Sequence, residues 1–289
     1  MRAEAEYALT LQDPDGNTYT VLGFNINEPG VTSFSTVEGL AFLGGVGDFP
    51  PVGVPLTVLS NSEGPTNPFT SLASPPCFTR GCRIETPNGA VPVEALTTGD
   101  IVLTADHGPQ AIRWVGKRSF SAHQLTRNPK LRPIRIMAGT LGADLPKCDI
   151  LVSRQHRMLL QSKIAQRMFG RHEVLVSAIK LTELPGVFVD GTVVDIEYFH
   201  LLFDQHEIIY AAGAPSESLF TGPEALRSIT PEAKAEVLSI FPEIKDLDYS
   251  PRPTRLIPSG KSQKQLIARH LTNNRPCISS ENPWHSQVV

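Results

Sequence analysis

The sequence has little cysteine and no long hydrophobic run. Its four cysteines, Cys77, Cys82, Cys148 and Cys277, are too few and too scattered for a disulfide scaffold. No stretch approaches the roughly 18 consecutive apolar residues of a membrane helix. The amino-terminal MRAEAEYALT carries acids where a secretory signal has its apolar segment. We therefore expect a soluble chain with no membrane span, either cytoplasmic or exported without a classical signal peptide, and the sequence leaves the compartment open.

Neither sign of charge is in large excess. Lys and Arg number 26 against 29 Asp and Glu, which gives a formal net charge of -3. A net charge this small produces no strong electrostatic field around the whole molecule, so the sequence gives no argument for a nucleic-acid partner. The 40% hydrophobic content of the 289 residues is enough for a sizeable core and for two domains.

Residues 1–59 predict a small β-rich region. Segments 7–11 and 17–24 alternate between apolar and polar residues, and the sequence Asp-Pro-Asp-Gly at 13–16 lies between them. In such a turn Pro presets φ and Gly allows a positive φ, so we expect a hairpin. Segment 26–58 shows no helical period and predicts further strands, for about five in the region.

Residues 60–76 predict an exposed linker, and Cys77 begins a folded module. The linker contains four prolines in seventeen residues. After Cys77, the segments RIET and AVPV flank Pro-Asn-Gly at 87–89, a strong hairpin signal. Cys77 therefore has an accessible peptide bond behind it, and a nucleophile in this position can attack its own preceding carbonyl.

Short apolar runs continue for more than a hundred residues beyond this hairpin. Gly, Pro, Asp or Asn separates most of them, which favours an all-β module of many short strands. A helical turn is expected within 91–100, ending at Gly99. The expected strands are at 100–104, 111–116, 133–139, 149–153, 157–160, 173–177, 186–190, 192–204 and 206–213.

Residues 221–249 predict helices and residues 250–289 a basic tail. One short helix is expected at 223–229, and a second begins at Pro231. The second carries an apolar stripe that predicts docking on a β core, formed by Ala233, Val237, Ile240 and Phe241. The tail has six basic residues against one acid and predicts disorder, apart from a helical stretch at 264–271.

Attack by Cys77 on the Pro76 carbonyl needs help from other side chains. The thiol sulfur and the carbonyl carbon close a five-membered ring, but an amide is more stable than a thioester. The module must therefore distort the bond and protonate the leaving nitrogen, and His is the natural donor near neutral pH. A hydroxyl or a backbone amide would stabilise the tetrahedral intermediate.

Two Ser/Thr-His pairs share one spacing. Ser153 and His156 lie between two apolar strands, at a corner where side chains can converge on a site, and we prefer them. Thr104 and His107 precede Gly-Pro and predict a hairpin tip, where a solvated His is ordinary. A third candidate is His206 at the start of the last strand of the module. Asp204 lies beside it in the sequence.

Three ordered blocks carry a resemblance to a known family. The first is CFTRGCRIETPNGAVPVEALTTGDIVLT, the second LVSRQHRMLL and the third HEIIYAAGAPSES. They resemble the opening block, the Thr-x-x-His block and the closing block of the Hint (hedgehog/intein) family, in its bacterial branch of stand-alone Hint-domain proteins. The resemblance covers residues 77–220. It implies an all-β, Hint-type horseshoe of many short strands and an N-S acyl shift at the Pro76-Cys77 bond.

The resemblance also implies roles for individual residues. Cys77 is the nucleophile, His156 the proton donor to the scissile nitrogen, and Ser153, in place of the family's Thr, the hydroxyl that polarises or orients it. His206 would assist a later step. The family's closing block has an acidic position for which Asp195 and Asp204 compete. No cofactor and no metal are implied, although a zinc site from Cys77, Cys82 and a His is a weaker alternative.

The closing block departs from that of a splicing intein. Glu217 and Ser218 lie near the positions where an intein ends in His-Asn, so the resemblance implies cleavage without splicing. The amino-terminal segment of the chain is the expected substrate, and water or an external thiol or amine is the acceptor.

Cys82 is near enough in sequence to form a redox pair with Cys77. The remaining histidines are expected at the surface or in the core, namely His107, His123, His172, His200, His270 and His285.

Two alternatives to autoprocessing stay open. One is an inactive Hint fold that serves as a structural or interaction module of a secreted or surface protein. The other is a cysteine hydrolase that acts in trans through Cys77 and His156. The second is disfavoured because Cys77 is internal, with 76 residues ahead of it.

Overall fold

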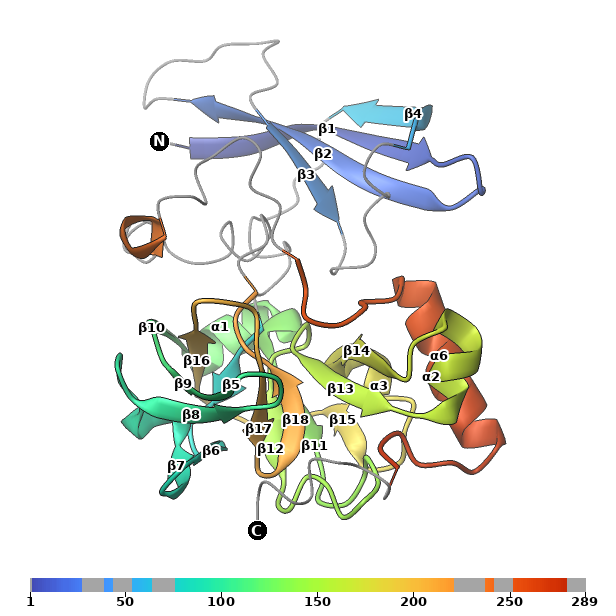
Figure 1. Cartoon of the computed structure of the whole chain (residues 1–289). Coiled ribbons are helices and arrows are strands. Elements are labelled where there is room, and N and C mark those ends of the chain that lie inside the picture. Colours follow the sequence, from blue (N-terminus) through green and yellow to red (C-terminus); the bar gives the residue numbers. More distant parts are fainter. Residues whose placement is uncertain are drawn as a thin grey trace. The chain divides into compact units, whose positions relative to one another are not determined.

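The chain forms two compact units in the computed structural model, Met1–Ala73 and Ser74–Val289, each described by itself below (Figure 1). The structure describes residues 2–27, 39–43, 54–63, 76–220, 237–241 and 252–279. The boundary between the units falls three residues before Cys77. The scissile bond predicted from the sequence therefore lies at the start of the second unit.

The first unit contains an antiparallel sheet of four described strands in the order β3-β2-β1-β4. These are β1 (Arg2–Gln12), β2 (Thr18–Asn27), β3 (Gly39–Leu43) and β4 (Thr57–Glu63). The β1–β2 hairpin is the one predicted from the sequence. In its turn the Asp13 carboxylate accepts from the Asn17 amide at 2.8 Å and the Tyr19 hydroxyl at 2.7 Å, and Gly16 has φ 83°.

The linker begins later than the sequence predicts. Strand β4 pairs with β1 as far as Glu63, so residues 60–63 belong to the sheet. Polar residues such as Ser60 can occupy an edge strand because backbone pairing does not depend on side-chain polarity. Residues 64–75 of the predicted linker lie outside the described residues.

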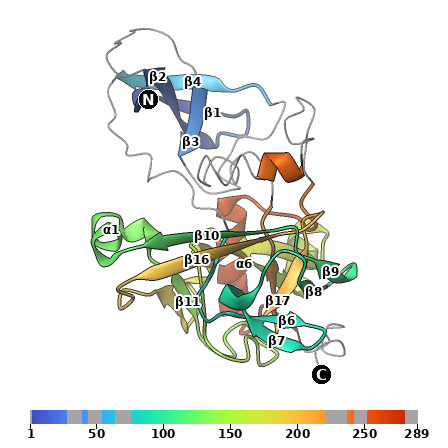
Figure 2. The same ribbon diagram turned by 90° about the vertical axis from the view of Figure 1, so that its left-hand side faces the viewer.

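The second unit contains two sheets (Figures 1 and 2). The first has the order β10-β16-β5-β12-β11-β15. Its strands are β10 (Trp114–Phe120), β16 (Ile196–Leu202), β5 (Phe78–Thr79), β12 (Ile150–Val152), β11 (Ile134–Ile136) and β15 (Val187–Val189). The short strand after Cys77 is thus an interior strand, between β16 and β12.

The second sheet has the order β14-β13-β18-β17-β6-β7, and a β8–β9 hairpin branches from β17. Its strands are β14 (Glu173–Ser177), β13 (Arg157–Gln161), β18 (Ala214–Glu217), β17 (Ile208–Ala211), β6 (Arg83–Thr86), β7 (Gly89–Pro92), β8 (Ile101–Thr104) and β9 (Gly108–Ala111). The hairpin predicted around residues 87–89 is β6–β7, with Gly89 at φ 99°.

One apolar cluster joins the two sheets. It contains Phe78 of β5, Ile134 of β11 and Phe199 of β16 from the first sheet, and Leu160 of β13 and Ile209 of β17 from the second. All are buried, and full burial of such a side chain stabilises a fold by about 1.5–3 kcal/mol. The predicted all-β class is confirmed, because short antiparallel strands outnumber helices among the described elements of the second unit.

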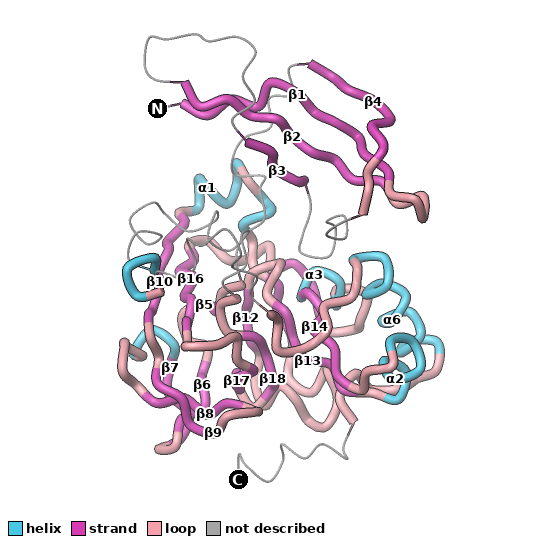
Figure 3. Tube along the Cα trace, turned by 45° about the horizontal axis from the view of Figure 1, so that its top comes forward, coloured by secondary structure: helices cyan, strands magenta, loops and turns pink. Residues whose placement is uncertain are grey.

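The described helices of the second unit are η2 (Val93–Ala95), α1 (Ala122–Arg127), η3 (Pro129–Leu131), α2 (Lys163–Phe169), α3 (Ala178–Leu181) and α6 (Gly260–Thr272). Except for the thirteen-residue α6, these helices are short, and α2, α3 and α6 lie together beside β13 and β14 (Figure 3). The predicted helical turn is η2, although it ends at Ala95 and not at Gly99 as predicted. Helices α1, α2 and α3 were not predicted from the sequence. Within the described parts of the chain, no helix is long and apolar enough to cross a membrane.

Two strand predictions need correction. The strand expected at 111–116 is divided, because β9 ends at Ala111 and β10 begins at Trp114. Strand β18, with the sequence APSE, was not predicted since two of its four residues are polar. All four are nevertheless buried.

The predicted docking stripe is confirmed where the structure describes it. Val237, Ile240 and Phe241 pack in a cluster with Trp114, Leu202 and Leu219. Ala233 and the helix predicted at 223–229 lie outside the described residues.

The carboxyl-terminal segment 252–279 differs from the predicted disordered tail. Helix α6 contains the predicted helical stretch and buries Leu266 and Ile267 in the main core. Gln263 accepts a hydrogen bond from the backbone amide of Ser177 at 3.0 Å. The few apolar residues of this segment lie mainly where it contacts the core. The segment as a whole has a polar and basic composition, so composition alone did not predict that it packs on the domain. Residues 250, 251 and 280–289 lie outside the described residues.

Candidate active site

Cys77 immediately precedes β5 and is buried, with 3% of its surface exposed. The next residue, Phe78, pairs with Val152 of β12 and with Phe199 of β16. The Cys77 carbonyl accepts from the Ser153 amide at 3.0 Å. Backbone pairing on both sides therefore holds the nucleophile predicted from the sequence in place. Because Cys77 is already ordered, a reaction at this residue would cost little further conformational entropy.

His200 of β16 contacts both groups that would react. Its Nδ1 lies 2.8 Å from the carbonyl oxygen of Pro76, and its Nε2 lies 3.4 Å from the sulfur of Cys77. Because a carbonyl oxygen can only accept, Nδ1 carries the proton in this contact. Burial lowers the pKa of His200 to about 4, so the ring is neutral at pH 7 and Nε2 is the acceptor that faces the thiol.

The thiol is not ionised in this environment. Burial raises the pKa of Cys77. The hydrogen bond with Ser153 and the positive charge of Arg118 lower this pKa, but their effects are smaller than that of burial. A thiolate is the nucleophilic form of cysteine, so the attack needs a base that removes the proton as the sulfur approaches the carbonyl. The neutral Nε2 of His200 is positioned to be that base.

Ser153 lies where the sequence predicts it. Its hydroxyl oxygen accepts from the backbone N–H of Cys77 at 3.1 Å, so it contacts the nitrogen of the scissile amide itself. Its carbonyl accepts from the His156 amide at 3.1 Å and closes the turn between β12 and β13. The predicted strand-to-strand corner is thus present, and it connects the scissile bond with His156.

His156 is buried behind β5 and packs edge-on against Phe78, with ring centroids 4.4 Å apart. Neither of its ring nitrogens has a hydrogen-bond partner among the described residues. Burial lowers the pKa of His156 to about 4, against the opposing effect of the Glu217 carboxylate. An imidazole buried without partners is costly for stability, and such groups occur at catalytic sites.

The structure does not bring His206 to Cys77. Nε2 of His206 lies 3.4 Å from the Glu217 carboxylate, and its Nδ1 accepts from the Thr254 amide at 3.2 Å. Its ring also packs against Phe220, with centroids 4.9 Å apart. His206 therefore belongs to a neighbouring buried cluster around Glu217.

Neither candidate for the acidic position contacts the thiol. Asp204 is at the surface with 64% of its side chain exposed, and pairs with Arg113 at 3.3 Å. Asp195 accepts from the Ala122 amide at 2.9 Å, at the first turn of α1. The side chain described beside the thiol is the imidazole of His200, which was expected to be an ordinary surface or core residue. Its sequence signal was a histidine among the apolar and aromatic residues 198–202 of the strand.

His107 lies at the tip of the β8–β9 hairpin, as the sequence predicts. It is not simply solvated, because Nδ1 lies 2.9 Å from the buried Glu207 carboxylate. This hydrogen bond raises the pKa of His107. Cys77 and Cys82, which are close enough in sequence for a redox pair, are both thiols in the structure, and Cys82 packs in a different apolar cluster from Cys77.

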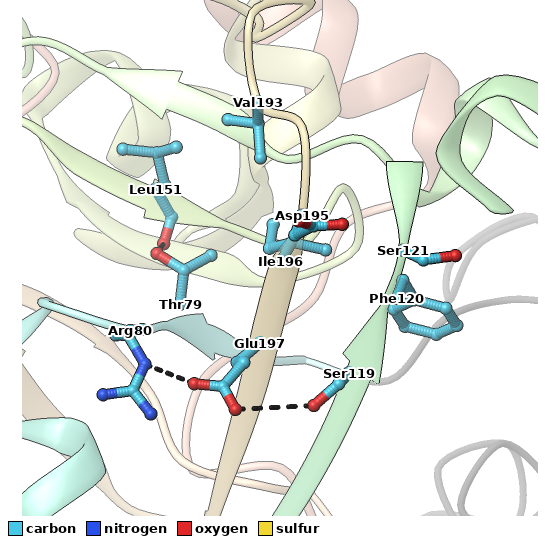
Figure 4. A pocket seen from close by; sticks show the side chains of 10 residues that line it. All are labelled: Thr79, Arg80, Ser119, Phe120, Ser121, Leu151, Val193, Asp195, Ile196 and Glu197. Atoms are coloured by element: carbon cyan, nitrogen blue, oxygen red, sulfur yellow. Dashed lines mark hydrogen bonds and ion pairs between the residues drawn. The ribbon is translucent and has the colours of Figure 1, made fainter. Parts of the chain in front are cut away.

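A pocket of about 630 Å³ borders the strands that hold the site (Figure 4). It is lined by Thr79, Arg80, Ser119, Phe120, Ser121, Leu151, Val193, Asp195, Ile196 and Glu197. Phe120 and Ile196 belong to the same apolar cluster as Cys77. Arg80 bonds to Glu197 at its edge, as Figure 4 shows.

These features define an all-β domain that begins at a buried cysteine, with a histidine spanning the thiol and the preceding carbonyl. The model of the Hint domain family matches residues 76–223, just over half of the chain. The chain belongs to this family, which confirms the resemblance found in the sequence.

Solved structures of intein-like domains also resemble the chain. The bacterial intein-like domain from Clostridium thermocellum is 13% identical over 49% of this chain and 97% of that one, with a TM-score of 0.32. The gp41-1 intein is 12% identical over 50% and 98%, with a TM-score of 0.30. The MchDnaB-1 intein is 13% identical over 48% and 98%, with a TM-score of 0.28. A comparison with curated proteins finds no significant match.

Proposed function

We propose that the domain cleaves its own chain at the Pro76-Cys77 bond through an N-S acyl shift, and that water or an external nucleophile resolves the thioester. The observation that carries the proposal is the position of His200. One imidazole contacts the carbonyl oxygen of that bond through Nδ1 at 2.8 Å and the Cys77 sulfur through Nε2 at 3.4 Å.

The first step forms the bond between the Cys77 sulfur and the Pro76 carbonyl carbon. As the sulfur attacks, its proton moves to Nε2 of His200, and the ring becomes an imidazolium. The same ring then donates from Nδ1 to the oxyanion that develops on the Pro76 oxygen. Charge on the imidazolium strengthens this hydrogen bond as the charge on the oxygen grows.

The second step breaks the bond between the Pro76 carbonyl carbon and the Cys77 nitrogen. Ser153 holds the N–H of this nitrogen at 3.1 Å and so fixes the plane of the amide. Protonated His156 supplies the proton that the leaving nitrogen needs, and the proton held by His200 returns to solvent. With a pKa of about 4, His156 is protonated in roughly 0.1% of molecules at pH 7. The reaction is therefore slow at neutral pH.

The thioester is resolved without splicing. Splicing would need a side chain near residues 217 and 218 that cyclises and frees the downstream chain. Glu217 is fully buried in β18, and the Ser218 amide donates to the Glu207 carbonyl at 2.9 Å. Packing of this kind favours a carboxyl-terminal segment that stays with the domain.

A trans-acting hydrolase is not supported by the same geometry. Cys77 is buried, and the carbonyl that contacts His200 belongs to the preceding residue of the same chain. A second substrate would have to displace Pro76 to reach the site.

The test is incubation of the freshly purified chain with dithiothreitol, followed by intact-mass analysis over time. We expect slow release of a fragment that ends at Pro76, because the thiol captures the thioester. The Cys77→Ala variant is the matched control and should stay intact. A wild-type chain that remains full-length after prolonged incubation would refute the proposal and leave the inactive structural module.

A further inference from the structure

A buried ion pair lies next to the catalytic corner and has no role in the steps above. Arg157 of β13 and Glu217 of β18 have side chains that are 1% and 0% exposed, and Nη1 of Arg157 lies 2.5 Å from Oε2 of Glu217. The other carboxylate oxygen accepts the backbone N–H of Arg157 at 2.8 Å. One carboxylate therefore binds both the side chain and the main chain of the residue that follows His156.

Arg157 is paired with Ser177 of β14, and on the side that faces β18 the carboxylate takes the place of backbone pairing. Strand β18 pairs with β13 through Ser216 and Met158. Arg157, the residue before Met158, lies at the end of this pairing. The His156 amide donates to the Ser153 carbonyl, and the His156 carbonyl accepts from the Ala178 amide at 2.8 Å. These two hydrogen bonds fix both backbone groups of His156, and the contact with Glu217 fixes the backbone N–H of the next residue, Arg157.

The charges around His156 come from four elements. Arg157 of β13, His200 of β16 and His206 before β17 each disfavour a positive charge on His156, and burial disfavours it most. Glu217 of β18 acts in the opposite direction. Among the described groups that influence His156, the carboxylate of Glu217 is the one that favours the protonated ring.

We propose that Glu217, paired with Arg157, is a positioning residue: its carboxylate fixes the backbone at His156 and holds a buried negative charge against the residue that follows it. The inference rests on the proposed function, in which His156 delivers the proton to the Cys77 nitrogen. It gives a role to the residue found near the position where a splicing intein has its terminal His-Asn.

The decisive variant is Glu217→Gln, which keeps the size of the side chain and an oxygen acceptor for the Arg157 amide but removes the charge. Without the carboxylate His156 takes up a proton at lower pH, so the curve of cleavage rate against pH shifts to lower pH. We expect the cleavage rate at pH 6 to fall roughly tenfold, which corresponds to a shift of about one pH unit. An unchanged curve in a folded variant would overturn the proposal.

The matched control is Glu207→Gln. Glu207 is also a buried carboxylate next to a histidine, but its partner is His107 on the β8–β9 hairpin. We expect this variant to keep the wild-type pH curve. A shift as large as that of Glu217→Gln would show that loss of any buried carboxylate produces the effect, and would also overturn the proposal.

Loss of the fold is controlled with a second variant, because Glu217→Gln leaves a buried guanidinium without a counter-charge. The double variant Arg157→Met/Glu217→Gln removes both charges and should retain a cooperative thermal transition. It removes the carboxylate together with the guanidinium that opposes it and keeps an oxygen acceptor for the backbone N–H of residue 157, so we expect its pH curve to lie between those of Glu217→Gln and the wild-type chain. A double variant shifted at least as far as Glu217→Gln would overturn the proposal, because it would show that the two charges do not act on His156 in opposite directions.

A readout that does not depend on cleavage separates this inference from the proposed function. In the Cys77→Ala background the histidine titrations can be followed by NMR with ring-labelled histidine. Adding Glu217→Gln should lower the titration midpoint of His156 by about one pH unit. A shifted midpoint in a chain whose Cys77 form never cleaves would refute the proposed function alone, whereas an unshifted midpoint would refute the role of Glu217.

Discussion

At the scale of single residues, the site has a thiol and an imidazole that are both neutral before the reaction. Burial raises the pKa of Cys77 and lowers the pKa of His200 to about 4, so each environment disfavours the charged form. A preformed thiolate-imidazolium pair is therefore not the resting state. In the proposed reaction, proton transfer must therefore accompany the attack of sulfur on the carbonyl, and the growing oxyanion would stabilise the imidazolium formed.

This arrangement predicts a large effect of His200→Ala. The change removes both the base for the thiol and the donor to the Pro76 carbonyl, so we expect thiol-dependent cleavage to fall by roughly 100-fold to 10,000-fold. His200→Asn can still donate to the carbonyl but cannot take the proton, and should retain more activity than the alanine variant. The measurement is the time course of the fragment by intact mass.

His123→Ala is the control, because that histidine is exposed on α1. It should cleave at the wild-type rate. Equal rates for His200→Ala and the wild-type chain would contradict the assignment of His200.

The two Ser/Thr-His corners predict different outcomes on mutation. His156→Ala should suppress cleavage by roughly 100-fold to 10,000-fold, as for a lost general acid. His107→Gln should leave the rate almost unchanged, because this residue pairs with Glu207 at a hairpin tip. Both variants are compared with dithiothreitol at one concentration. A loss of cleavage in the His107 variant alone would place the proton donor on the β8–β9 hairpin.

At the scale of elements, the features that the sequence predicts are those with local causes. The turns at 13–16 and 87–89 depend on Pro and Gly at fixed offsets, and both hairpins form as expected. The corner that holds Ser153 and His156 follows from two apolar strands separated by a short polar segment.

The elements missed depend on distant partners. Strand β18 contains Ser216 and Glu217, which are buried because Arg157, sixty residues earlier, pairs with Glu217. His200 meets Pro76 across a separation of 124 residues. A single sequence states neither pairing. The positions of Cys77 before a strand and of Ser153 at a strand-to-strand corner could therefore be predicted, whereas the contact of His200 with the thiol could not.

Helix α6 gives a prediction at this scale. Leu266 is fully buried in the main core, so Leu266→Ala should lower the free energy of unfolding by about 2–5 kcal/mol. Lys264→Ala, at an exposed position of the same helix, should change it by less than about 0.5 kcal/mol. Urea unfolding in the Cys77→Ala background measures both. Equal small effects would show that α6 does not stabilise the domain and would restore the interpretation of the segment as a tail.

At the scale of the whole molecule, the reactive bond lies close to the boundary between the two compact units. The first unit ends at Ala73, and the predicted cleavage follows Pro76. Cleavage at this bond would therefore separate the small four-stranded sheet from the Hint domain without breaking a described strand. Each product would keep its own sheets.

The fate of the two products gives the last prediction. Glu217 binds Arg157 through two contacts, and residues 252–279 pack on the same domain through α6, so we expect the carboxyl-terminal part to remain attached if the proposed thioester forms. We expect two products: an amino-terminal fragment that ends at Pro76 with a free acid or an added nucleophile, and the remainder that starts at Cys77. The measurement is peptide mass spectrometry of the processed material, with a search for any peptide that joins Pro76 to a residue beyond Phe220. Detection of that joined peptide would show that the domain splices, and its absence together with the modified Pro76 terminus would support cleavage alone.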